Sequence, residues 1–388
     1  MAPPVSRASP AGDAAPRLGE EFVLLGPRGS RPFDAPDLEA ELRAMWRSAS
    51  LEGPARGQAV YRAALANLVV PLDAPGLRHL SSVLVEVTRR LPSRLFLIET
   101  SSGAPPGPLR ARVTALCHMR TEGGALCSEQ IVLQPGSGAE PLVPSAVRSL
   151  LVGELPVVLL DVHPGVPSPW REELWRAADL LLGDSALYDD PEDAAPLWER
   201  IVREGSARVH DLAWARLMPW REILAELFDR PSLGASLPTV CEVEVDHGAG
   251  RAGTPSAPAL LLSGWLAARL GWKAGRREDG ALRLQGTHGS IRVTFRNDPA
   301  DDTRSVSRVR LRSGAPRPLA LEVVRHGRDP RVAIRIDEPV AERREVSFHY
   351  REFAACIVGE IHRHEANPTL LESVAAARSL GGAWAGAA

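Results

Sequence analysis

The stretch Asp211-Leu-Ala-Trp-Ala-Arg-Leu-Met-Pro-Trp-Arg-Glu222, continued through Asp229, decides how this chain is interpreted. After Pro219, which suits a first helical turn, apolar residues recur at the spacing of one helix face. These residues are Trp220, Ile223, Leu224, Leu227 and Phe228. Trp214 and Arg216 stand in a tight connection between Asp211 and this helix. Because Trp is usually buried, the pattern favours a helix docked on its own domain over a partner surface.

Met218 occupies the position that we expect to be the N-cap of this helix, directly before Pro219. A threonine there would accept a hydrogen bond from a free backbone N–H of the first turn and add about 1 kcal/mol. A methionine instead packs its thioether against an indole. We expect the packing to dominate, so that Met218→Thr destabilises the first domain by roughly 1–3 kcal/mol.

Helix-period and short apolar segments alternate from about residue 60 to residue 230. The expected strands are 67–70, 95–98, 113–119, 130–133, 156–161 and 180–185, with 113–119 and 130–133 paired across Gly123-Gly124. The expected helices, after a first one opened by Asp34 and Pro36, include 77–91, 145–152, 170–177 and 191–203. Such alternation predicts a doubly wound, mostly parallel, Rossmann-like α/β domain.

The pattern changes from Val240 onward. Strands with strict alternation are expected around 291–295, 309–311, 319–323 and 332–336, with helices at 258–270, 351–364 and 368–377. Alternation of this kind predicts an antiparallel sheet with one buried face, in a smaller α+β domain. The division is therefore a disordered leader at 1–33, an α/β domain at 34–230, a linker at 232–237 and an α+β domain at 238–380.

Composition narrows the class of protein. The 388 residues are 44% apolar and 24% charged, with a net charge of −2, which gives no reason to expect nucleic acid as a partner. No window reaches the ~18 apolar residues of a membrane span. The Ala/Pro/Ser-rich start has no signal-peptide core, so we expect a cytoplasmic protein.

The four cysteines, Cys117, Cys127, Cys241 and Cys356, lack CxxC spacing. Neither a structural zinc site nor a disulfide scaffold is expected. Cys117 and Cys127 lie on adjacent expected strands, where oxidation is conceivable, but buried reduced thiols are the favoured interpretation.

No motif predicts a catalytic, cofactor-binding or metal site. Neither Gly26-Pro-Arg-Gly29 nor Gly136-Ser-Gly138 completes a phosphate-binding fingerprint. The histidines of His362-Arg-His364 do not face one point on a helix. Asp161-Val-His163 has no positioned nucleophile. Asp189-Asp190 is expected to favour the N-terminus of the following helix.

Arginines alternate with apolar residues in the second domain. Arg308, Arg310 and Arg312 share one sheet face, and Arg292, Arg296, Arg331 and Arg335 have the same phase on their strands. Such a face is either plain solvation or a docking surface for acidic protein groups or a sugar phosphate. For docking, we expect Arg308→Glu with Arg310→Glu to abolish the partner's response.

The opening stretch resembles the Asp-Leu-x-Trp-Ala-Arg-Leu-x-Pro-Trp-Arg signature of the glucose-6-phosphate dehydrogenase assembly proteins, the OpcA family, in which Thr is common where this chain has Met218. Other pieces match the same family, namely Asn67-Leu-Val-Val70, Pro92-Ser-Arg94, Leu155-Pro-Val-Val158, Asp184-Ser185, Asp190-Pro191 and Gly264-Trp-Leu-Ala-Ala-Arg-Leu-Gly-Trp272. Arg120 and Cys127-Ser-Glu-Gln-Ile131 resemble the family's Arg and Cys-Cys-Glu-Gln-Ile segment, with Ser128 replacing the second cysteine. The resemblance covers residues 36 to 380.

The resemblance implies a non-catalytic assembly factor and allosteric activator. It would bind glucose-6-phosphate dehydrogenase and support the oxidative pentose phosphate pathway, without a cofactor. The residues expected at the family signature or partner interface are Arg120, Glu129, Gln130, Asp211, Trp214, Arg216, Trp220, Arg221, Arg308, Arg310 and Arg312. Glu129 and Gln130 are expected to satisfy backbone donors or to pair with Arg120, rather than to act as acid or base. The alternative is an α/β enzyme or binding protein for a sugar phosphate or nucleotide.

Overall fold

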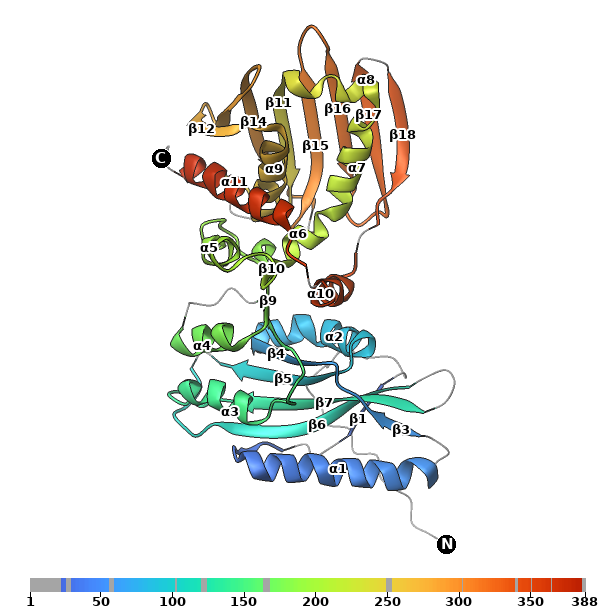
Figure 1. Ribbon diagram of the computed structural model, residues 1–388, viewed down its shortest axis with the longest axis vertical. Helices are drawn as coiled ribbons and strands as arrows, with labels where there is room; N and C mark the ends of the chain where they lie inside the picture. Colours follow the sequence, from blue (N-terminus) through green and yellow to red (C-terminus); the bar gives the residue numbers. More distant parts are fainter. Residues whose placement is uncertain are drawn as a thin grey trace.

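The computed structural model contains two β-sheets stacked along its long axis, with helices between and around them (Figure 1). It describes residues 22–25, 29–55, 59–101, 103–119, 124–162, 168–248, 253–301, 303–338, 341–349, 351–363 and 365–385. Two sheets, each packed against helices, agree with the predicted fold class of an α/β domain followed by an α+β domain. No helix among these residues is long and apolar enough to cross a membrane.

The first sheet is mostly parallel. Its order is β1-β6-β7-β5-β4-β8-β9-β10, with β2 beside β6 and β3 beside β7. Its strands are β1 (Phe22–Leu25), β2 (Arg31–Pro32), β3 (Val60–Arg62), β4 (Ala66–Asp73), β5 (Ser93–Thr100), β6 (Arg110–Met119), β7 (Ala125–Gln134), β8 (Val157–Asp161), β9 (Leu180–Gly183) and β10 (Val209–Asp211). The strands from β7 to β10 follow, in chain numbering, the order 3-2-1-4-5-6 of dinucleotide-binding folds. The sequence pattern missed β3 and β10, which are too short to show a period.

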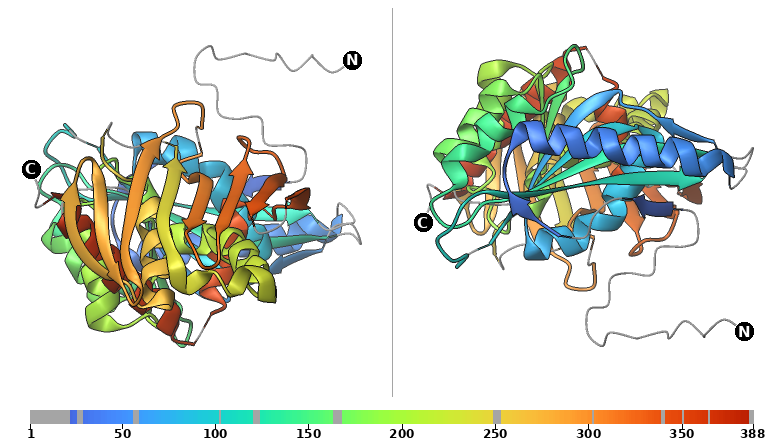
Figure 2. Two further views of the ribbon diagram at one scale, coloured as in Figure 1. Left: turned by 90° about the horizontal axis from the view of Figure 1, so that it is seen from above. Right: turned by 90° about the horizontal axis from the view of Figure 1, so that it is seen from below.

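Helices cover both faces of this sheet, as the doubly wound prediction requires. They are α1 (Ala35–Ala55), α2 (Ala74–Arg90), α3 (Val143–Ser149), α4 (Pro169–Ala177), α5 (Ala195–Glu204) and α6 (Leu212–Arg216). Successive sheet residues alternate between two apolar clusters: Val69 packs with residues of α1 and α3, and Leu68 and Val70 pack with α2. Seen from below, α1 lies across the sheet (Figure 2).

Part of the predicted leader is structured. β1 pairs antiparallel with β6, with Phe22 opposite His118, and β2 pairs with the same strand. The expectation of a disordered leader over 1–33 is therefore wrong for these two strands, whose few residues give no periodic signal. Residues 1–21 lie outside the described part of the chain.

The predicted hairpin of β6 and β7 is confirmed, and its cysteines correct another expectation. Cys117 and Cys127 stand directly opposite each other in the antiparallel register and form a disulfide. Reduced thiols were the favoured interpretation because spacing alone does not reveal which residues are opposite each other. Both residues are buried against α1, next to Met45 and Trp46.

The second sheet has the order β12-β13-β14-β11-β15-β16-β17-β18. Its strands are β11 (Val240–His247), β12 (Lys273–Glu278), β13 (Ala281–Gly286), β14 (Gly289–Asn297), β15 (Val306–Ser313), β16 (Leu319–Arg325), β17 (Arg331–Glu338) and β18 (Glu342–Ser347). Neighbouring strands are antiparallel except β11 and β14, which are parallel. The prediction of a mainly antiparallel sheet is confirmed. It missed β11 and β13 as well as the charged edge strands β12 and β18.

One face of the second sheet packs on helices. α7 (Met218–Phe228), α9 (Ala257–Leu270) and α11 (Pro368–Ala385) cover it, and the short α8 (Pro231–Gly234) follows α7 (Figure 1). Gly264 allows close packing of α9 on α11, because a Cβ there would overlap the backbone of Ser373 and Ala377. Burial alternates along β15 and β16, so the opposite face of these strands carries the charged side chains.

The helix α10 (Phe353–Ile361) departs from the expected division of the chain. It lies within 238–380, yet Ala354 and Ile357 belong to the apolar cluster of Leu80 and Leu84 on α2. The chain therefore returns from the second sheet to the first before α11. This crossing ties the two sheets together.

Candidate functional site

Acidic residues stand along the carboxyl edge of the first sheet, where α/β folds bind their ligands. They lie at the ends of adjacent parallel strands: Asp73 on β4, Glu99 on β5, Asp161 on β8, Asp184 directly after β9 and Asp211 on β10. The environment of each carboxylate decides what chemistry this edge can perform.

The turn from β4 to α2 has no phosphate cradle. Asp73 is the N-cap of α2, and its Oδ1 accepts a hydrogen bond from Gly76 N at 2.7 Å. In a dinucleotide-binding fold this helix N-terminus receives the pyrophosphate. Here a carboxylate occupies that place and repels a phosphate.

Asp161 is held by an internal ion pair. Its Oδ1 lies 2.7 Å from Arg171 Nη1, and its Oδ2 accepts from Trp175 Nε1 at 2.8 Å. Both partners come from α4. His163, from the Asp161-Val-His163 segment considered above, lies outside the described residues.

Asp184 and Asp211 form a buried network with the signature stretch. Arg216 binds both oxygens of Asp184, at 2.6 and 2.9 Å. Asp211 caps α6 and accepts from Ser185 N, Ala213 N and Trp198 Nε1 at 2.9–3.0 Å. Burial and the nearby Asp184 charge raise the pKa of Asp211.

Tyr188 is half-buried close to these carboxylates. Burial, reinforced by the charges of Asp161 and Asp211, raises its pKa to about 12. A phenol of that pKa holds its proton at neutral pH. It is therefore a poor general base.

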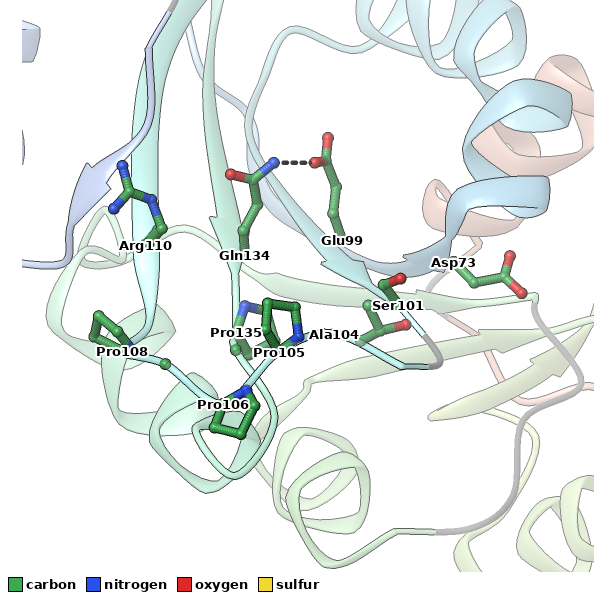
Figure 3. Close-up of a pocket in the computed structure, with 13 residues that line it drawn as sticks. Asp73, Glu99, Ser101, Ala104, Pro105, Pro106, Pro108, Arg110, Gln134 and Pro135 are labelled. Atoms are coloured by element: carbon green, nitrogen blue, oxygen red, sulfur yellow. Dashed lines mark hydrogen bonds between the residues drawn. The ribbon is translucent and has the colours of Figure 1, made fainter.

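An open pocket remains at the ends of β4, β5 and β7, with a volume of about 480 Å³ (Figure 3). Its walls carry Pro105, Pro106 and Pro135, and Glu99 accepts from Gln134 Nε2 at 2.5 Å inside it. Arg112 lies 3.3 Å from the same carboxylate. Glu99 and Gln134 are thus engaged with each other inside the pocket.

The two tryptophans of the signature are buried. Trp214 is stacked under the Arg221 guanidinium, whose carbon lies 3.3 Å from the ring centroid, and burial lowers the pKa of Arg221 to about 9. Trp220 is fully buried and meets Phe348 edge-on, with centroids 5.5 Å apart. Neither indole presents a surface to a partner, which agrees with the docked-helix interpretation.

Met218 does not occupy the position expected from the sequence. Leu217 is the N-cap of α7, and Met218 is its first residue, because α6 runs almost directly into α7. No side-chain hydrogen bond caps α7. Met218 is only half-buried. Both premises of the Met218→Thr expectation therefore fail.

Glu129 is the centre of a second buried cluster. Its carboxylate lies 2.7 Å from Arg94, 2.8 Å from Arg62 and 2.7 Å from Trp46 Nε1. Glu129 is 1% exposed and Arg94 3%. Arg120 lies outside the described residues, and Gln130 accepts from Thr114 Oγ1 at 3.1 Å. Ion pairing, rather than acid or base chemistry, accounts for this glutamate.

The arginine face of the second sheet is compensated by acids that the sequence analysis did not consider. Arg308 pairs with Glu244 and Asp246, and Arg310 lies 3.0 Å from Glu244 and 2.5 Å from Glu322. Arg308→Glu with Arg310→Glu would break this ladder, so it cannot isolate a docking role. Arg312 is different, since it is 57% exposed and its nearest acid, Glu242, is 4.0 Å away.

The remaining acids and histidines have simple roles. Asp190 Oδ1 accepts from Glu192 N in a turn, since α5 begins only at Ala195, and Asp189 pairs with Arg304. His364 lies outside the described residues. Within the described ranges, no group of three or more His, Cys, Asp or Glu side chains is arranged to hold a metal ion.

Sequence reasoning missed how the family-like motifs meet in space. Arg94 pairs with Glu129, and Asp184 pairs with Arg216. Asn67 donates to the carbonyl of Leu155 at 3.2 Å. Each pair joins two of the motifs quoted above, which the sequence alone does not show to be in contact. The motifs mark side chains that hold the fold.

The pair of His210 and Glu360 was also missed, and it joins β10 to α10. His210 Nδ1 lies 2.9 Å from Glu360 Oε2, and both residues are buried. Burial of the Glu360 carboxyl opposes ionisation, but the hydrogen bond and charge of His210, with Arg363, lower its pKa overall.

This pair should make stability fall in acid. A carboxyl with a depressed folded pKa stabilises the fold above its unfolded pKa of about 4.3 and loses that contribution as pH falls through the folded value. Urea midpoints between neutral pH and acid should therefore fall more steeply for the wild type than for Glu360→Gln. Parallel curves would remove Glu360 from this account.

Comparison with known proteins shows which family this chain matches. The model described as "Glucose-6-phosphate dehydrogenase subunit N-terminal domain" matches residues 85–200, and the one described as its C-terminal domain matches residues 207–374. Together they cover the first sheet from β5 onward and the whole second sheet, and leave out β1 to β4.

Curated relatives named OpcA, after the OxPP cycle, match part of the chain. The relative from Nostoc punctiforme is 31% identical over 193 residues, which is 48% of this chain and 40% of that protein. The one from Synechocystis is 28% identical over 167 residues, 42% of this chain and 34% of that protein. The match thus spans well under half the length of these relatives.

Solved structures resemble the model more distantly. A 3-ketoreductase from Actinomadura kijaniata, in complex with NADP, has a TM-score of 0.45 and 14% identity, and covers 81% of this chain and 96% of its own. The Gal80p repressor of Saccharomyces cerevisiae also has a TM-score of 0.45, with 11% identity, and covers 83% and 95%. Similarity at this level carries no statement about chemistry. By the two family models and the curated relatives, this chain belongs to the OpcA family, whose models are described as the two domains of a glucose-6-phosphate dehydrogenase subunit.

Proposed function

We propose that this protein binds glucose-6-phosphate dehydrogenase and acts as a non-catalytic assembly factor and activator in the oxidative pentose phosphate pathway. The observation that carries the proposal is the family match, which covers the first sheet from β5 onward and the whole second sheet. The relatives are named after the same pathway.

The carboxyl edge of the first sheet supports a role without catalysis. Asp161, Asp184 and Asp211 are each held by arginine, indole or backbone donors. Asp73 stands where a pyrophosphate would bind. An enzyme for a nucleotide or sugar phosphate, the alternative, would need a phosphate cradle and an available acid–base pair at this edge.

For the docking surface, we propose the outer face of the second sheet around Arg312. Arg310, Arg312 and Arg335 line a shallow hollow of about 170 Å³ there, together with Glu322 and Asp337. These two acids pair with Arg310 and Arg335, so Arg312 is the guanidinium best placed to meet a partner. Arg312 and Arg335 are half-exposed, at 57% and 49%. Guanidinium groups bind carboxylates in a fixed geometry, so an acidic side chain of the dehydrogenase fits this hollow.

Arg312→Glu should weaken binding to the dehydrogenase by about tenfold or more, since a charge pair across an interface contributes more than about 1.4 kcal/mol. Dissociation constants at low and moderate salt measure the effect, and wild-type binding should weaken as salt rises.

Arg148→Glu is the matched control. Arg148 is 50% exposed and pairs with a single glutamate, Glu173, on the first domain. It should leave binding unchanged. If Arg312→Glu binds like the wild type, the docking face lies elsewhere. Binding of the dehydrogenase by the wild-type chain tests the functional proposal itself.

A further inference from the structure

A pocket of about 640 Å³ lies between helices of the two halves of the molecule. One wall comes from α5 and the turn before it, and the other from α9, β12 and α11. A volume of this size is typical of small-molecule sites. Neither the family match nor the proposed binding of the dehydrogenase accounts for it.

Arg277 on β12 is the most telling residue of this pocket. It is half-buried, and among the described residues no carboxylate lies within ion-pair distance of it. Its guanidinium instead stacks on Trp384, with its carbon 4.1 Å from the ring centroid. By contrast, Arg94, Arg216 and Arg325 are each buried with a carboxylate partner. Burying a guanidinium without a counter-ion costs free energy. An anionic ligand would offset that cost by supplying the opposite charge.

A second guanidinium lines the same pocket. Arg378 on α11 lies 2.9 Å from Glu199 on α5, and both side chains are partly exposed. This pair links the two walls and places a further cation beside the space near Arg277. Two arginines suit a dianionic phosphate better than a single carboxylate, because a phosphate offers more acceptor oxygens.

The other polar residues of the lining suit hydroxyl groups. Asp190 and Glu192 line the pocket, and their carboxylates can accept hydrogen bonds from hydroxyl groups. Trp198, Leu260 and Trp384 are buried behind the lining and give the pocket a rigid apolar floor. Cationic groups for an anion and acceptors for hydroxyl groups thus occur together.

We propose that this pocket binds a sugar phosphate. The phosphate lies at Arg277 and Arg378, and the hydroxyls lie at Asp190 and Glu192. Trp198, which lines the pocket, also donates to Asp211 in the signature network, so an occupant touches the junction of the two sheets. No bond is made or broken in this binding.

Isothermal titration calorimetry on the full chain alone tests the proposal, with glucose 6-phosphate, glucose and inorganic phosphate as separate probes. We expect glucose 6-phosphate to bind and the other two to bind at least about tenfold more weakly, since each lacks one set of contacts. This titration uses no dehydrogenase. Its outcome is therefore independent of whether the chain binds the dehydrogenase, and the two proposals can fail separately.

Arg277→Gln should lower the affinity for glucose 6-phosphate by about ten- to a hundredfold, because it removes the charge-assisted hydrogen bonds of one guanidinium to the phosphate. Arg276→Gln is the control, since Arg276 is 80% exposed and does not line this pocket. Arg378→Gln gives a second variant if Arg277→Gln melts below the wild type.

Three results would overturn the proposal. The first is no heat of binding for glucose 6-phosphate. The second is equal affinity for inorganic phosphate, which would reduce the site to an anion site without sugar recognition. The third is unchanged affinity in both arginine variants.

Discussion

Replacing Arg94 by alanine should destabilise the first domain by about 3–5 kcal/mol, because it leaves the carboxylate of Glu129 buried with its main partner removed. Arg94 is 3% exposed and Glu129 1%, and their atoms lie 2.7 Å apart. Arg94 also donates to the carbonyl of Leu150 and to Glu39. The loss would leave the Leu150 carbonyl without this donor as well, whereas Glu39, at 33% exposed, can turn to water. Urea denaturation of the full chain measures the effect as a lower midpoint.

Two comparisons test the cause. Arg89→Ala removes an exposed pair with Glu86 on α2 and should change stability by less than about 1 kcal/mol. Arg94→Met with Glu129→Leu removes both charges and should recover much of the loss, because no unpaired charge remains buried. A midpoint for Arg94→Ala equal to that of Arg89→Ala would contradict this account of the Glu129 cluster.

Local sequence pattern was sufficient to predict the apolar strands of the first sheet. Asn67-Leu-Val-Val70 and Leu95-Phe-Leu-Ile98 are buried on both faces, so hydrophobicity alone marks them. β18 could not be predicted in this way, because Glu342-Arg-Arg-Glu-Val-Ser347 at the sheet edge has a single apolar residue, Val346, and so shows no apolar period.

Side-chain partners were harder to predict, since they depend on strand register. Arg308 and Arg310 looked like an unpaired cationic face, but β11 places Glu244 opposite Arg310 and Asp246 opposite Arg308. The same holds for Cys117 and Cys127, whose disulfide follows from their being directly opposite in the hairpin. Long-range pairing of this kind leaves little trace in a single sequence.

The family-like motifs also take on a different meaning in the structure. Asp211 and Arg216 were expected at a signature or a partner interface, yet both serve the network that joins β9, β10 and α6. Arg216 also lies over Phe353 of α10, with its guanidinium carbon 5.2 Å from the ring centroid. Side chains used in this way are unavailable to a partner. The surface of this chain that we propose for docking therefore lies among exposed residues such as Arg312.

The largest functional effect should appear in the dehydrogenase itself. A protein that binds the active or assembled form of an enzyme more tightly than the inactive form shifts the equilibrium toward activity, by no more than that difference in affinity. A coupling of about 1–3 kcal/mol corresponds to a 5–150-fold change. Because the carboxyl edge of this chain offers no phosphate cradle, we expect the chain alone to oxidise no glucose 6-phosphate.

Steady-state kinetics of glucose-6-phosphate dehydrogenase from the same organism, with and without an equimolar amount of this chain, test the central claim most directly. The chain should co-elute with the dehydrogenase in gel filtration and raise its rate or lower its apparent KM, while showing no dehydrogenase activity alone. Separate elution together with unchanged kinetics, or dehydrogenase activity from the chain by itself, would contradict it.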